Sequence, residues 1–179
     1  MKVSPLNLTI VIMVIFLFPC CSYFKDTTLS GDEMVASAEP QSRYYYFTES
    51  QLVRKKGNID EAIKHLNKAI EIDPESFYMQ RELAILYLQL KDSDKALNII
   101  KKILEKDPGN IQTLILYGKL NQNLKKVDAA KSAYEKVVSI DPKQESIFLL
   151  LGDLYMQEDN LNKALKTYKQ LIQNFPESH

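Results

Sequence analysis

The sequence predicts an all-α solenoid of four helical hairpins, and two features of its 179 residues carry that prediction. The first is composition: after residue 43 the chain is dominated by Leu, Ile, Lys, Ala, Gln and Glu, and the whole sequence has only 5 Gly and no Trp, which favours helix. The second is a period of 34 residues. A fixed period of this length in a helical chain indicates stacked units that share one continuous core.

Residues 1–20 precede the repeats and have the pattern of a secretory signal. A single positive charge, Lys2, is followed by an almost wholly apolar run over residues 6–18. A helix over this run spans roughly 20 Å, which is shorter than the ~30 Å hydrocarbon core of a bilayer. We therefore expect a signal peptide, and a short uncleaved anchor that extends to Phe24 is the alternative.

Both cysteines of the chain, Cys20 and Cys21, close the apolar run, so the folded region has no disulfide framework. An apolar run closed by cysteine resembles the signal of bacterial lipoproteins, in which that cysteine is acylated and becomes the new N-terminus. We place the lipid on Cys21, with Cys20 as the alternative. Two or more acyl chains make a stable anchor. The resemblance thus implies a membrane-anchored lipoprotein of the bacterial cell envelope that faces the periplasm or the exterior.

Residues 21–42 are expected to form a flexible tether. They are mostly polar and small, include Gly31 and Pro40, and have no sustained hydrophobic period. A random coil of this length spans on the order of 25 Å. The folded part is expected to begin at Arg43.

Three kinds of residue carry the period of the folded part. Prolines recur at Pro74, Pro108, Pro142 and Pro176. Alanines recur at Ala62, Ala96, Ala130 and Ala164, and small residues at Ser50, Ala84, Gly118 and Gly152. The alanines and small residues suit the point where two helices cross closely, where a larger side chain would force them apart. The prolines suit the end of the second helix, because proline disfavours helical geometry in the residue before it.

This pattern resembles the tetratricopeptide repeat (TPR) family, which implies a right-handed superhelical solenoid over residues 43–179. The helix-turn-helix repeats are placed at 43–76, 77–110, 111–144 and 145–178. The tryptophan that the family has at the fourth position is replaced by Tyr46, Gln80, Leu114 and Phe148. Repeat one has Glu49 and repeat three has Asn121 where an apolar residue is usual.

The resemblance also implies a function, because the first helices of TPR repeats line a concave groove that holds a peptide or a partner protein. The first repeat contributes Tyr44, Phe47, Gln51 and Arg54, and the second Tyr78, Arg81, Ile85 and Leu88. The third contributes Gln112, Ile115, Lys119 and Gln122, and the fourth Ser146, Leu149, Asp153 and Met156. Amide side chains suit hydrogen bonds to a bound backbone, and apolar ones set specificity.

The last repeat predicts a second contact surface. TPR arrays normally finish with a solvating helix, and here no further helix follows residue 178, so Leu165, Ile172 and Phe175 are expected to be uncovered. A contiguous apolar patch of this kind usually marks an interaction site. Self-association, docking of a partner and continuation of the array in a longer protein are the three explanations.

The sequence argues against catalysis and against several ligand classes. It contains no phosphate-binding glycine loop, nucleophile elbow or metal motif, and His65 and His179 have no partner at metal-ligand spacing. We therefore expect no enzymatic activity, no cofactor and no metal. The formal net charge of zero gives no basic surface for nucleic acid.

These observations favour a lipid-anchored scaffold that holds a peptide or partner protein while a membrane or envelope complex assembles. Going from fold to function in this way is analogy. The alternatives are the TPR arm of a larger enzyme, a component of a secretion or export system, and a purely structural spacer.

Overall fold

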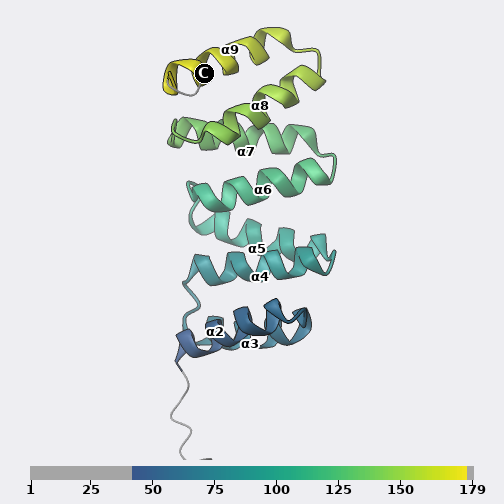
Figure 1. The fold of residues 1–179 in the computed structure, drawn as a ribbon, viewed down its shortest axis with the longest axis vertical. Helices are drawn as coiled ribbons and strands as arrows, with labels where there is room; N and C mark the ends of the chain where they lie inside the picture. Colours follow the sequence, from purple (N-terminus) through teal and green to yellow (C-terminus); the bar gives the residue numbers. More distant parts are fainter. Residues whose placement is uncertain (1–41, 177–179) are drawn as a thin grey trace, which may run out of the picture. The chain divides into compact units, whose positions relative to one another are not determined.

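The computed structural model describes residues 42–176, which form four consecutive helical hairpins (Figure 1). The helices are α2 (Arg43–Lys55), α3 (Ile59–Ile72), α4 (Phe77–Gln89), α5 (Ser93–Lys106), α6 (Ile111–Asn123), α7 (Val127–Ile140), α8 (Glu145–Gln157) and α9 (Leu161–Asn174). The predicted all-α fold of four helix-turn-helix repeats is confirmed. Cys20, Cys21 and all of the predicted tether except Ser42 lie outside the described residues.

Within each hairpin a left-handed residue lies in the turn between the two helices, and in all but the third a side chain also caps the second helix. In the first hairpin Gly57 has a φ of 85°, and Asn58 Oδ1 accepts a hydrogen bond from the N–H of Glu61 at 3.4 Å. Glycine adopts this conformation readily because it has no Cβ. The later hairpins place other residues at the position of Gly57: Lys91, Lys125 and Asp159, with φ of 61°, 58° and 56°.

Replacing Lys125 with glycine is therefore expected to stabilise the fold by about 1 kcal/mol. An L-residue in the left-handed conformation costs roughly 1–2 kcal/mol, which glycine avoids. Glycine also has more conformational freedom in the unfolded chain, and this offsets part of the stabilisation. The Lys125 N–H bond to the Gln122 carbonyl (3.0 Å) survives the change. Chemical unfolding of the two proteins measures the effect. Lys102→Gly, at an exposed site inside α5, is the control and should lose about 1 kcal/mol; an unchanged Lys125→Gly protein would show that this turn stores no strain.

Small residues let the two helices of a hairpin cross closely. The alanines that recur on the second helices, Ala62, Ala96, Ala130 and Ala164, are all buried. In the third hairpin Gly118 lies against the ring of Tyr134, so that a Cβ on Gly118 would be 2.3 Å from Tyr134 Cε1. In the fourth, a Cβ on Gly152 would be 2.5 Å from Tyr168 Cε1. Each of these glycines thus makes room for an aromatic ring of its own repeat.

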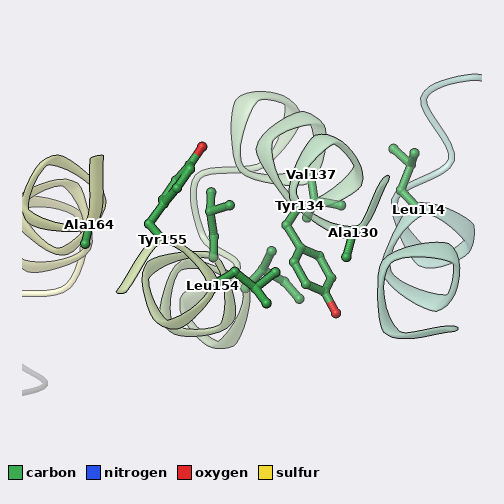
Figure 2. Close-up of a cluster of buried hydrophobic side chains, with 9 residues drawn as sticks. Leu114, Ala130, Tyr134, Val137, Leu154, Tyr155 and Ala164 are labelled. Atoms are coloured by element: carbon green, nitrogen blue, oxygen red, sulfur yellow. The ribbon is translucent and has the colours of Figure 1, made fainter. Parts of the chain in front are cut away.

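Successive hairpins join where the second helix of one packs on the first helix of the next. At the last of these junctions Ala130, Tyr134 and Val137 of α7 share a buried cluster with Ile147 and Leu154 of α8 (Figure 2). Equivalent clusters join α3 to α4 and α5 to α6. The core is therefore one series of short-range contacts along the array, as expected for a solenoid.

Candidate partner-binding groove

The first helices of repeats one and two lie side by side, as side-chain contacts between them show. Arg54 of α2 bonds Glu82 of α4 with 3.0 Å between Nη1 and Oε2, and both side chains are partly buried. The rings of Phe47 and Tyr78 have centroids 5.5 Å apart. Side chains of α2 and α4 therefore form one surface, and we call the predicted groove positions of all four first helices the groove face.

The predicted groove residues divide into exposed and half-buried sets. The exposed ones are Tyr44, Tyr78, Gln112, Lys119, Ser146, Leu149, Asp153 and Met156. The half-buried ones are Phe47, Gln51, Arg54, Arg81, Ile85, Leu88, Ile115 and Gln122. In repeats one and two most of the set is therefore half-buried, whereas most of the set in repeats three and four is open to a partner.

Two of the predicted groove residues accept a hydrogen bond from a tyrosine on the second helix of their own repeat. Tyr134 Oη donates to Gln122 Oε1 at 3.1 Å, and Tyr168 Oη donates to Asp153 Oδ1 at 2.7 Å. Burial raises the pKa of Tyr134 to about 12, so its hydroxyl stays protonated and keeps donating at physiological pH. Burial, followed by the hydrogen bond to Asp153, also raises the pKa of Tyr168. Gln122 and Asp153 thus orient core tyrosines, a role that the sequence analysis did not assign to them.

The groove face has two cations that are not neutralised by a neighbour. Neither Arg81 nor Lys119 forms an ion pair with any residue between 42 and 176, whereas Arg54 is paired with Glu82. The Arg81 guanidinium lies 5.6 Å from the centroid of the Tyr78 ring, which steadies it by a cation–π contact. The central part of the groove face is therefore suited to a carboxylate of a bound chain.

The predicted C-terminal patch is open in part. Leu165 and Ile172 on α9 are exposed, as expected, whereas Phe175 is half-buried at the end of the helix. The Phe175 N–H donates to the carbonyl of Leu171 at 2.9 Å, which ties the residue to the last turn. Leu161 is exposed as well and was not predicted as part of the patch.

A hollow of about 520 Å³ lies among α7, α8 and α9, where the sequence analysis placed no site. Residues of α7, α8 and α9 line it, among them Glu135, Tyr155 and Lys163. Tyr155 Oη donates to Glu135, and Lys163 Nζ lies 5.2 Å from the centroid of the Tyr155 ring. Burial, with the Glu135 bond, raises the pKa of Tyr155. Glu135, Tyr155 and Lys163 therefore contact one another within this hollow.

Neither a metal-binding cluster nor a membrane-spanning helix occurs in the part of the chain that the structure describes. Between residues 42 and 176 no three acidic, His or Cys side chains gather closely enough to hold a metal ion. In the same part of the chain, no helix has the length and apolar character needed to cross a bilayer.

The family model of the tetratricopeptide repeat matches residues 54–120 and 124–179, which is more than half of the chain. The chain belongs to the tetratricopeptide repeat family. Among curated protein sequences no relative matches it.

Solved TPR structures share the fold at low sequence identity. A crystal structure of MamA has a TM-score of 0.64 and 18% identity, covering 75% of this chain and 74% of its own. MamA from Desulfovibrio magneticus RS-1 has a TM-score of 0.63 and 15% identity, covering 76% and 77%. A TPR protein from Parabacteroides merdae has a TM-score of 0.65 and 21% identity, covering 79% of this chain and 55% of its own. At such identities the likeness establishes the TPR fold alone.

Proposed function

We propose that this TPR protein is a non-catalytic, lipid-anchored scaffold of the bacterial cell envelope, which holds a peptide or partner protein in its groove during assembly of a membrane or envelope complex. TPR proteins bind other proteins or peptides, and that general role is the basis of the proposal. The anchor is inferred from the apolar run that Cys20 and Cys21 close. Self-association through the C-terminal patch is part of the same proposal.

The unpaired cations of the groove face carry the proposal. Arg81 and Lys119 have no carboxylate partner between residues 42 and 176, and half-buried Ile85 and Ile115 belong to the same set of groove positions. A groove with such side chains suits a partner segment that has both acidic and apolar residues. Charge complementarity of this kind supplies specificity and a faster encounter.

A crosslinking pull-down from native membranes tests the groove. The full-length protein is compared with an Arg81→Ala, Gln112→Ala, Lys119→Ala variant, which removes groove side chains without cutting into the core. The control carries Asn98→Ala, Lys102→Ala and Lys136→Ala, the same number of cations and amides removed from exposed sites on the second helices. We expect a partner that is recovered by the parent and the control and lost by the groove variant. Recovery of the same partner by all three proteins would show that the partner does not bind through these groove side chains.

Metabolic labelling with a fatty acid tests the anchor. We expect the label on the parent chain and on Cys20→Ser, and its loss from Cys21→Ser, because the proposal places the acyl chains on Cys21. Loss from Cys20→Ser alone would move the lipid to the neighbouring cysteine. An unlabelled parent chain would refute lipid anchoring.

A further inference from the structure

The second helix of a repeat has a stripe of residues that faces the next repeat, and on α9 this stripe is bare. In the first repeat it consists of Ile59, Ile63 and Ile70, which pack in one cluster with Met79 and Leu86 of α4. Three periods later the equivalent residues of α9 are Leu161, Leu165 and Ile172, whose exposed fractions are 60%, 55% and 52%. The outer face of α9 is thus the counterpart of a face that α3 uses to hold a first helix.

The first helix of a repeat has the complementary stripe, and on α2 it is also bare. Tyr45 and Leu52 of α2 are 43% and 46% exposed. Their equivalents in the later repeats, Met79 and Leu86, Thr113 and Leu120, Ile147 and Leu154, are at most 5% exposed. In those repeats the stripe lies against the second helix of the preceding repeat, and α2 has no preceding repeat within residues 42–176.

The first helices also contact each other at a repeat junction, and each end of the array has one half of this contact. At the first junction the rings of Phe47 and Tyr78 pack with their centroids 5.5 Å apart. The equivalent of Phe47 in the last repeat is Leu149, and the equivalent of Tyr78 in the first repeat is Tyr44. These two side chains are 44% and 62% exposed. If an α2 followed α9, it would bring Tyr44 onto Leu149 as Tyr78 lies on Phe47.

One ion pair of a repeat junction can be followed to the two ends. At the last junction inside the chain, Lys131 of α7 pairs with Glu158 at the end of α8. The equivalents at the ends are Leu165 and Lys56. A lysine opposite a leucine can lay its methylene stem on the apolar side chain and keep its ammonium in water. No like charges face each other at this position.

We infer that the outer face of α9 is the docking site for α2 of a second copy of this chain, so that copies join head to tail. The joint repeats the junction that the chain already makes between its own repeats, with the same stripe on each side. Because the two surfaces differ, the contact is heterologous, and each added copy again presents a free α9. The inference rests on the self-association that the proposed function assigns to the C-terminal patch, and it specifies the partner surface. It does not depend on the groove.

Variants of the full chain in which one of the two faces is blocked test the inference by sedimentation. The measurements are made in excess detergent micelles, which keep the apolar N-terminal residues 1–20 of different copies apart. Leu165→Lys blocks the α9 face, because it places a lysine opposite Lys56 of the next copy, and Leu52→Glu blocks the α2 face. Both leucines are exposed, so the fold is expected to tolerate the changes, which thermal unfolding checks. The parent should grow in mass with concentration without stopping at a dimer. Each variant alone should associate more weakly, by about tenfold or more, because the joint would bury an unpaired carboxylate in Leu52→Glu and would bring two lysines together in Leu165→Lys.

A mixture of the two variants gives the deciding result. Each has one open end, so an equimolar mixture should form dimers and nothing larger. Self-association of Leu52→Glu alone would mean that α9 pairs with α9, and this would overturn the inference. Association that neither variant changes would indicate contact through the apolar N-terminal residues 1–20, and this would refute the inference. A parent protein that stays monomeric would show that no second copy docks, and this would refute it as well. The groove variant with Arg81→Ala, Gln112→Ala and Lys119→Ala should still associate, which separates this test from that of the groove.

Discussion

Replacing Gly118 with alanine is expected to destabilise the protein by about 2 kcal/mol, although alanine is the better helix former by about 1 kcal/mol. The new Cβ would lie 2.3 Å from Cε1 of Tyr134, far inside van der Waals contact. The ring of Tyr134 is fully buried and its hydroxyl is bonded to Gln122, so it cannot move aside easily. Overpacking of this kind costs typically about 1–3 kcal/mol, with backbone shifts at the upper end.

A second substitution, copied from repeat two, is expected to restore part of the stability that Gly118→Ala loses. Where Gly118 and Tyr134 stand in repeat three, repeat two has Ala84 and Ile100. A Gly118→Ala, Tyr134→Ile protein would recreate that pair. Tyr134→Ile alone should cost about 2–4 kcal/mol, since it leaves a cavity and frees Gln122 from its hydrogen bond. The double variant should lose less than the sum of the two single changes.

Urea unfolding of the parent, the two single variants and the double variant measures this coupling, which a double-mutant cycle isolates. Gly152→Ala provides a comparison at the open end, where Tyr168 is only half-buried and its ring has room to shift. It should cost less than Gly118→Ala. Additive losses in the cycle would show that the glycine and the ring do not share the same space.

The period, the helix-favouring composition and the resemblance to TPR proteins together predicted most of this fold. The first helices begin at Arg43, Phe77, Ile111 and Glu145, the residues at which the sequence analysis places the repeats. The recurring small residues lie at the helix crossings because only there does the volume of a side chain decide how closely two helices approach. A period gives such positions directly, since each repeat solves the same packing problem.

The side-chain contacts of the groove were harder to predict. Sequence spacing places Gln122 and Asp153 on the exposed side of their helices. It does not show that the long side chains of Tyr134 and Tyr168 reach them from the second helix. The same limit applies to Phe175, whose position depends on how the last turn of α9 ends. Periodicity assigns a residue to a face, whereas hydrogen bonds depend on side-chain length and rotamer.

Four equivalent leucines allow the contribution of a neighbouring repeat to be measured at one position. Leu86, Leu120 and Leu154 are 0%, 3% and 1% exposed, and each lies against the second helix of the repeat before it, whereas Leu52 is 46% exposed. Leu86→Ala should lower the free energy of unfolding by about 2–5 kcal/mol, because it removes buried apolar atoms and leaves a cavity. Leu52→Ala should cost about 1 kcal/mol or less in dilute protein, because that side chain is already half in water.

Protein concentration then distinguishes the two leucines further. If a second copy docks on α2, the parent gains stability from binding as its concentration rises, and Leu52→Ala weakens that gain. The cost of Leu52→Ala, measured by chemical unfolding, should therefore increase with protein concentration, while the cost of Leu86→Ala should change little. A large cost of Leu52→Ala already in dilute protein would show that another part of the same chain covers this face of α2. In that case the covering segment, and not a second copy, would take the place of the preceding repeat.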